Sequence, residues 1–304
     1  MLKTPGFFIA LMLSVATATW ASNKEETVNF TEIQKQAIFA GTSYLSGADI
    51  HALVETDNYA LTRYHTIPDI QMSYFLATNE LTKTQIISVR GTSNSENTRV
   101  NISLRLQPNK ETGILLHQGF SAAAKRVYTE LQPLLKTDYK IKTTGHSSGG
   151  AVAVILAMYL DVAQFNVEQV ITFGQPKVTN FSGATKFQHL NILRVVTPLD
   201  PVPLLPPFDS LDINNVEVYW HAGKEIVLLA DTQYAILEDL DSMLRATRFT
   251  RKLLSEKNLE NHRMRFYLKM IGPKTASSRR IPYPTDFNLF NLFSGFLSTA
   301  RSNI

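Results

Sequence analysis

Short apolar runs rich in β-branched residues alternate along the chain with longer stretches that have helical spacing. The runs predict strands at 72–77, 85–89, 139–144, 167–173 and 190–196, and the spacing predicts helices at 30–45, 119–135 and 148–160. Residues 148–160 are apolar on nearly all sides, which is typical of a buried helix. Strands that alternate with helices favour an α/β fold with a mostly parallel central sheet and helices on both faces.

The pattern changes in the last third of the chain. Val216–Trp220 and Glu225–Leu229 resemble the two strands of a hairpin around Gly223. Ala235–Leu254 is rich in charged residues and predicts a surface helix. The body is expected to end near Gly272, so that residues 22–272 form one globular domain.

The N-terminus has the three-part pattern of a secretory signal peptide. Lys3 is followed by a mostly apolar run at residues 7–19, which is short for a membrane span, and small residues precede two cleavage points, after Ala18 and after Ala21. We therefore expect residues 1–21 to be a signal peptide and the mature protein to be periplasmic or extracellular.

Composition excludes several kinds of chemistry. The chain has 304 residues, of which 44% are hydrophobic and 18% charged, as in ordinary globular proteins. The net charge of +4 is scattered, so we expect no nucleic-acid partner. There is no cysteine, which rules out disulfides and a cysteine nucleophile. A His-Glu-x-x-His motif is also missing, and we predict neither a metal nor a cofactor.

A Gly-x-Ser-x-Gly motif at Gly145–Gly149 places Ser147 between a predicted strand and a predicted buried helix. The motif alone is only suggestive, but this setting is what the nucleophile elbow of α/β-hydrolases requires. Its turn is so tight that side chains at the two glycines would clash, and it directs the first helix amides at a developing oxyanion. A phosphate-binding turn is the alternative, and it fits poorly because no lysine follows the glycines.

A serine nucleophile needs a general base and an acid that orients the base. Only His189, His221 and His262 follow Ser147 in the chain. His262 comes after the last core strand, where a loop can place it over the elbow, and we predict it to be the base. His221 lies within the predicted hairpin and is expected to be structural, while His189 is expected at the surface.

Asp200 is the candidate acid because it follows directly on a β-branched strand. Functional loops in this architecture lie at the carboxyl ends of the strands. Asp209 and Asp212 compete with it, but they lie farther along a proline-rich loop, where solvated acids are common.

Several ordered blocks of sequence resemble the class 3 (fungal-type) lipases. The resemblance covers about residues 72–268. Its blocks are Arg90-Gly91-Thr92, His117-Gln118-Gly119-Phe120, Gly145–Gly150, Thr172-Phe173-Gly174-Gln175-Pro176, Asp200-Pro201-Val202-Pro203 with Leu205-Pro206-Pro207, Tyr219–Glu225 and Asn261-His262. Each block is weak alone, but their shared order makes the likeness specific.

The resemblance implies an α/β-hydrolase fold, a catalytic triad of Ser147, Asp200 and His262, and an oxyanion hole formed by Thr92 and the backbone N–H of Ser148. Loss of one such donor typically costs about 3 kcal/mol of transition-state stabilisation. The resemblance also implies that His221 is structural, and that Arg90 and His117 belong to the scaffold.

The chain departs from the family pattern at two places. Ser148 stands where the family usually has leucine, which leaves the backbone donor in place but alters the acyl pocket. The segment Ser93–Ser103, where such lipases carry an apolar lid, is mostly polar. A polar lid gains little from opening onto a lipid surface, so we expect weak interfacial activation.

The C-terminal segment 273–304 is expected to be a basic linker followed by an amphipathic tail. The tail's helically spaced apolar residues are Phe287, Phe290, Phe293 and Leu297. This stripe fits either a peripheral contact with anionic lipid or packing against the body.

The sequence thus predicts an exported serine hydrolase that acts on lipid-like carboxylic esters through an acyl-enzyme. A phospholipase A1 or lysophospholipase activity is the alternative within enzymes, since it uses the same catalytic parts. A non-catalytic lipid-binding protein on a hydrolase scaffold is the alternative outside them.

Overall fold

The structure is a computed structural model that describes residues 27–91, 105–206, 218–246 and 255–283. The expected signal peptide and the amphipathic tail therefore lie outside the described residues. No helix in the described ranges is long and apolar enough to cross a membrane.

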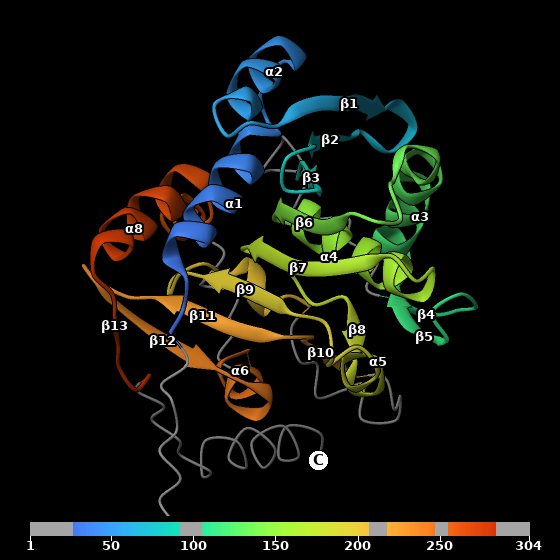
Figure 1. Cartoon of the computed structure of the whole chain (residues 1–304). Helices are drawn as coiled ribbons and strands as arrows, with labels where there is room; N and C mark the ends of the chain where they lie inside the picture. The colour runs from blue at the N-terminus through green and yellow to red at the C-terminus, as the bar shows by residue number, and fades with distance from the viewer. Residues whose placement is uncertain (1–26, 92–104, 207–217, 247–254, 284–304) are drawn as a thin grey trace, which may run out of the picture.

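A nine-stranded sheet with the order β1-β2-β3-β6-β7-β9-β11-β12-β13 organises the fold (Figure 1). Strands β3, β6, β7, β9 and β11 run parallel to one another, while β1–β2, β2–β3 and β11–β12 are antiparallel. The strands are β1 (Ala60–Ile67), β2 (Met72–Asn79), β3 (Thr84–Val89), β6 (Lys140–His146), β7 (Asn166–Phe173), β9 (Ile192–Val196), β11 (Lys224–Leu228), β12 (Gln233–Leu237) and β13 (Arg279–Arg280). The predicted mostly parallel sheet is confirmed.

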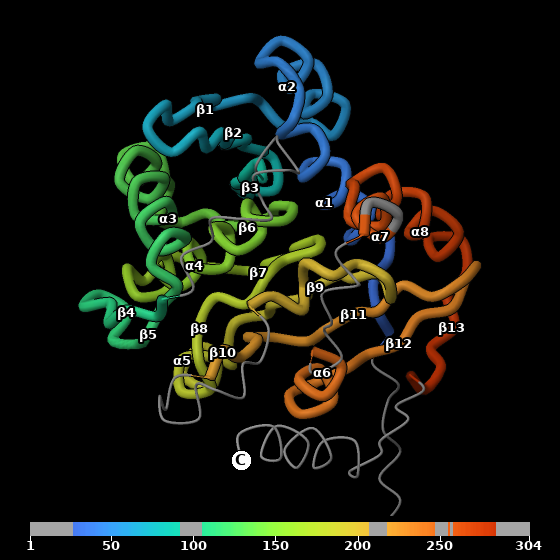
Figure 2. Tube along the Cα trace, turned by 180° about the vertical axis from the view of Figure 1, so that it is seen from behind, coloured from blue at the N-terminus to red at the C-terminus, as the bar shows by residue number. Residues whose placement is uncertain are grey.

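Helices cover both faces of this sheet (Figures 1 and 2). Helices α1 (Phe30–Thr42) and α8 (Met264–Ala276) pack together on one face, and α3 (Gln118–Leu131) and α4 (Ser148–Val162) on the other. Successive strand residues point to opposite faces, so Val170 belongs to the core beneath α4 while its neighbour Ile171 packs beneath α1. Helix α4 is buried from Ser148 to Leu160, as its sequence predicted.

A four-stranded sheet with the order β10-β8-β5-β4 lies beside the central one. Its strands are β4 (Leu106–Asn109), β5 (Ile114–His117), β8 (Thr179–Asn180) and β10 (Tyr219–Trp220). The remaining helices are α2 (Gly47–Glu55), α5 (Phe181–Lys186), α6 (Asp239–Ala246) and α7 (Glu256–Glu260), and short 3-10 turns lie at Pro68–Ile70, Gln132–Leu134 and Val202–Leu204.

The prediction of a hairpin around Gly223 is wrong. Strand β10 pairs with β8 in the small sheet, whereas β11 lies between β9 and β12 in the large one. Gly223 has a φ of +79°, and a Cβ there would lie 2.4 Å from the Cβ of Ile192. At Gly223 the chain therefore runs close to β9 and crosses from the small sheet to the large one. It does not form a hairpin.

The prediction of a surface helix at Ala235–Leu254 is also wrong at its start. Ala235 lies within β12, which pairs with β11 through four residues of each strand, and α6 begins only at Asp239. Tyr234 and Ala235 are buried by this pairing. Residues 233–237 form a strand because they are buried against β11. The charged residues that favoured a helix do not decide the conformation here.

The linker expected after Gly272 begins inside a helix. Helix α8 continues through Pro273 to Ala276, and β13 then joins the edge of the central sheet beside β12. The ammonium of Lys274 donates to the carbonyls of Leu229, Asp231 and Met270, at 2.9, 2.7 and 2.9 Å. The chain to Tyr283 therefore belongs to the folded body.

Candidate active site

Ser147 lies on a sharp turn between β6 and α4. Its φ of 58° and ψ of −131° fall in a region that non-glycine residues rarely adopt, and its backbone N–H donates to Phe173 O at 2.9 Å. A Cβ on Gly145 would come within 2.5 Å of Gly149 O, and one on Gly149 within 2.2 Å of Val89 O. The two glycines are therefore required by the turn, as the motif predicted.

Asp200 and His262 form a hydrogen-bonded pair. Nδ1 of His262 donates to Oδ2 of Asp200 at 2.8 Å, while Nε2 of His262 is buried and has no partner among the described residues. A histidine held at Nδ1 by a carboxylate has the tautomer that leaves Nε2 able to accept a proton. The pair thus has the arrangement of a general base and its orienting acid.

The Asp200 carboxylate is fully buried and is satisfied by three donors. Oδ2 also accepts from the hydroxyl of Tyr267 at 2.5 Å, and Oδ1 accepts from the N–H of Val202 at 2.9 Å. Burial alone would raise the pKa of Asp200, but the neighbouring His262 and these hydrogen bonds outweigh it and hold the pKa below its usual value. The carboxylate therefore stays ionised behind the histidine.

Gly174 leaves space for the Asp200–His262 pair beside the turn that carries Ser147. It follows Phe173, whose carbonyl accepts from Ser147, and it has a φ of +60°. A Cβ at this position would lie 2.8 Å from Asp200 Oδ2 and 2.9 Å from Nδ1 of His262. Only glycine leaves room for the acid and the base at the end of β7.

His146 links the elbow to the loop that carries His262, which the sequence did not predict. Nε2 of His146 lies 2.6 Å from the His262 carbonyl oxygen, so it carries the proton, and Nδ1 accepts from the Tyr44 hydroxyl at 2.8 Å. Burial, followed by the neighbouring His262, lowers the pKa of His146 to about 3. The His146 ring therefore stays neutral, and its centre lies 4.5 Å from that of the His262 ring. The only signal of this role in the sequence was the place of His146 inside the Gly-x-Ser-x-Gly motif.

The other histidines lie away from this pair. His221 is buried and donates from Nε2 to Pro203 O at 2.8 Å, which fits the structural role expected of it. His189 is exposed and pairs with Asp161. His117 caps α3 by accepting from Phe120 N–H and stacks on the Phe120 ring at 4.0 Å.

Several predicted residues lie where the structure gives no description. Thr92, the polar segment Ser93–Ser103 and the competing acids Asp209 and Asp212 fall in the ranges 92–104 and 207–217. Ser148 is described, and its amide opens α4 directly after Ser147. The amino end of a helix favours negative charge, which suits an oxyanion at this position.

A serine on a strand-turn-helix elbow, followed along the chain by a hydrogen-bonded Asp–His pair, is the arrangement typical of serine hydrolases of the α/β-hydrolase class. Residues 86–210 match the family described as Lipase (class 3). The chain is thus similar to the class 3 lipases over this range, and the resemblance seen in its sequence is confirmed.

Curated proteins with related sequences carry lipase names. The chain is 30% identical over 173 residues to a secreted mono- and diacylglycerol lipase of Fusarium solani, across 54% of this chain and 50% of that protein. It is 26% identical over 116 residues to a chloroplastic phospholipase A1 of Arabidopsis thaliana, across 34% of this chain and 16% of that protein. The chain therefore matches half or less of the length of these two relatives.

Solved structures show the same fold. The Lip2 lipase of Yarrowia lipolytica superposes with a TM-score of 0.62 at 21% identity, over 78% of this chain and 93% of that one. A lipase of Rhizopus microsporus var. chinensis gives a TM-score of 0.56 at 23% identity, over 66% and 74% of the two chains. These likenesses confirm the predicted α/β-hydrolase fold.

Proposed function

We propose that the protein hydrolyses carboxylic esters of lipid-like substrates with Ser147 as nucleophile, His262 as general base and Asp200 as the acid that orients it. The observation that carries this proposal is the free, buried Nε2 of His262, because its ring is held by Asp200 on one side and lies against His146, the neighbour of Ser147, on the other. Class 3 lipase relatives support the substrate class.

The reaction runs in two halves. The Ser147 oxygen attacks the ester carbonyl while His262 Nε2 takes its proton, and the charge on the carbonyl oxygen is stabilised by the amides of Ser148 and Thr92. His262 then gives the proton to the departing alcohol, which leaves an acyl-enzyme. A water molecule, deprotonated by the same nitrogen, releases the fatty acid and restores Ser147.

A matched pair of variants tests the assignment. Ser147→Ala removes the nucleophile and should abolish hydrolysis of p-nitrophenyl esters, while Ser148→Ala keeps the backbone donor and should retain most of it. Circular dichroism would check that both variants fold. Full activity of folded Ser147→Ala would refute the nucleophile.

Phospholipase A1 or lysophospholipase activity is the second candidate, because a phospholipase A1 is among the relatives. Comparison of kcat/KM for a monoacylglycerol, a triacylglycerol, a phosphatidylcholine and a lysophosphatidylcholine decides between the two. A non-catalytic lipid-binding role predicts that a fluorophosphonate probe leaves Ser147 unlabelled, whereas hydrolysis predicts covalent labelling of that residue.

Export and membrane contact belong to the same proposal. The relative from Fusarium solani is named as secreted, and residues 1–21 have the pattern of a signal peptide. N-terminal sequencing of the mature protein should begin at Thr19 or Ser22. A lipid contact through the tail 284–304 predicts that truncation after Tyr283 weakens binding to anionic vesicles without loss of hydrolysis of soluble esters.

A further inference from the structure

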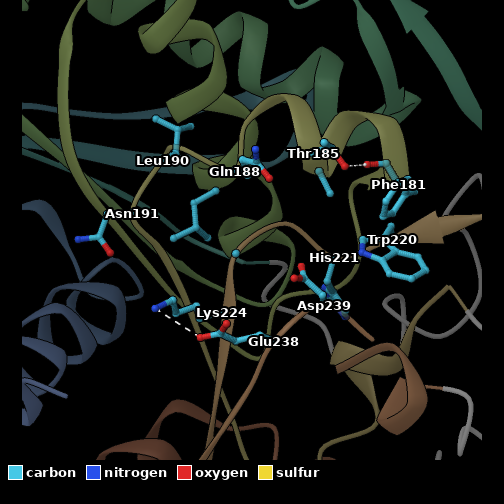
Figure 3. Close-up of a pocket in the computed structure, with 13 residues that line it drawn as sticks. Phe181, Thr185, Gln188, Leu190, Asn191, Trp220, His221, Lys224, Glu238 and Asp239 are labelled. Carbon is cyan, nitrogen blue, oxygen red and sulfur yellow. Dashed lines mark hydrogen bonds and ion pairs between the residues drawn. The ribbon is translucent and has the colours of Figure 1, made fainter. Parts of the chain in front are cut away.

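A pocket lies at the end of the central sheet where its parallel strands begin, whereas Ser147 lies where they end. Ile192 and Lys224, which line it, are the first residues of β9 and β11, whereas Ser147 follows the last residue of β6, and these strands run parallel. The cavity has a volume of about 220 Å³ and lies between these strands, α5 and β10 (Figure 3). It is therefore separate from the candidate active site.

Two aromatic rings form one side of this pocket. Phe181 and Trp220 meet edge to face, with ring centres 5.2 Å apart and planes at 85°. Phe181 is 61% exposed, so the protein leaves much of a large apolar ring in water at the rim. Leu190 and Ile192 supply further apolar surface. Such a wall suits the C–H groups of a ligand.

His221, which lines the pocket, carries a buried hydrogen-bond acceptor without a partner among the described residues. His221 is only 5% exposed, and its Nε2 donates to Pro203 O, so the proton is on Nε2 and Nδ1 can only accept. Nδ1 is buried and unpaired among the described residues. An unsatisfied buried acceptor destabilises the folded protein. A ligand that donates an O–H or N–H to Nδ1 would remove this destabilisation.

Charges on both sides of the pocket restrict the ligand further. Burial, then the charges of Arg194 and Lys177, lower the pKa of His221 well below its usual value. A cation next to His221 would be repelled by the same two side chains. At the rim, Glu238 pairs with Lys224 at 3.4 Å and Asp239 adds a second carboxylate, so an anion is also disfavoured.

We propose that this pocket binds a small neutral ligand with several hydroxyl groups, such as a polyol or a monosaccharide. One hydroxyl would donate to His221 Nδ1, and the C–H face of the ligand would lie against Trp220. Exposed side chains around the pocket can bond the remaining hydroxyls: the amides of Gln188 and Asn191 both donate and accept, and the Thr185 hydroxyl, which donates to Phe181 O, can accept. The volume is below the roughly 300–1,000 Å³ of typical drug-sized sites, which restricts the ligand to a compact one.

Saturation-transfer NMR and calorimetric titration with glycerol, glucose, choline and inorganic phosphate test the proposal on the full-length protein. We expect glycerol or glucose to bind with a dissociation constant in the millimolar range, and choline and phosphate not to bind. Trp220→Ala and Phe181→Ala should each weaken binding at least fivefold. Leu240→Ala is the matched control, because Leu240 is 62% exposed and does not line the pocket.

His221→Phe tests the acceptor itself, since it keeps a planar ring and removes Nδ1, and it should abolish binding. If this buried substitution prevents folding, the ¹⁵N shift of Nδ1 in the wild type should still move when the ligand is added. Titration of Ser147→Ala should give the wild-type affinity whether or not the enzyme hydrolyses esters. Absence of polyol binding, tighter binding of choline or phosphate, or unchanged affinity in the Trp220 and Phe181 variants would overturn the proposal.

Discussion

The Tyr267 hydroxyl and the His262 ring donate to the same oxygen of Asp200, at 2.5 and 2.8 Å. Tyr267 lies in α8 and is fully buried. Its pKa is raised well above the usual value by burial and by the adjacent Asp200. The phenol therefore keeps its proton and fixes the oxygen that orients the candidate base.

Replacement of Tyr267 by phenylalanine should weaken catalysis without abolishing it. The buried carboxylate loses one of its donors, so its pKa rises and the His262 ring is held less firmly. We expect kcat/KM for a soluble ester to fall about tenfold, equivalent to about 1.4 kcal/mol. Tyr64→Phe, in β1 at the far edge of the sheet, should leave kcat/KM unchanged. Equal effects of the two substitutions would contradict a positioning role for Tyr267.

Gly174→Ala should inactivate the enzyme while the protein still folds. The added methyl would lie within 3 Å of both Asp200 and His262, at a φ of +60° that alanine adopts only with strain. We expect the Asp–His pair to be pushed apart and activity to fall at least a hundredfold, measured with a p-nitrophenyl ester. Gly272→Ala is the control, because nothing lies within 4 Å of a Cβ there. A fully active Gly174→Ala would show that the pair tolerates displacement.

Acid should destabilise the protein through His117. Burial lowers the pKa of His117 from 6.5 to about 4, so the unfolded chain takes up the proton first as the pH falls. The stability that the neutral ring contributes is complete above pH 6.5 and is lost as the pH falls through that value towards 4. At pH 5 the loss is about 2 kcal/mol.

His117→Asn keeps an acceptor at the start of α3 and removes the titration. Urea unfolding between pH 7 and pH 4.5 should therefore show a shallower loss of stability in this variant than in the wild type. His51→Gln, at an exposed histidine in α2, should show the wild-type slope. A wild-type slope in His117→Asn would mean that His117 is not a source of acid lability.

Two C-terminal truncations should differ in folded yield. Truncation after Gly272 cuts α8, removes Lys274 with its three carbonyl contacts, and deletes β13 from the sheet. Truncation after Tyr283 keeps all of these. We expect the first variant to be recovered mostly as insoluble protein and the second to keep the melting temperature of the full chain. A soluble first variant with an unchanged melting temperature would show that residues 273–283 contribute nothing to stability.

The nucleophile elbow was predictable from the sequence because its motif and the adjoining strand and helix form one short stretch of the chain. A Cβ on Gly145 would meet Gly149 O, four residues along the chain, whereas a Cβ on Gly149 would meet Val89 O in the neighbouring strand β3. The alternating parallel strands were equally predictable, since their β-branched runs are buried on both faces. The order of Ser147, Asp200 and His262 along the chain was visible as well.

Only the tertiary structure decided what supports these residues. Tyr44 lies 102 residues from His146, and Tyr267 lies 67 residues from Asp200, so neither hydrogen bond leaves a local pattern. Likewise, β12 is a strand because it pairs with β11, although its sequence predicted part of a helix. The sequence by itself determined the elbow motif, the buried strands and the order of the candidate triad, because turn motifs and periodic burial are visible in short stretches of the chain. Folding decided which distant groups hold the acid and the base, because hydrogen bonds between remote segments depend on packing that no short stretch of residues encodes.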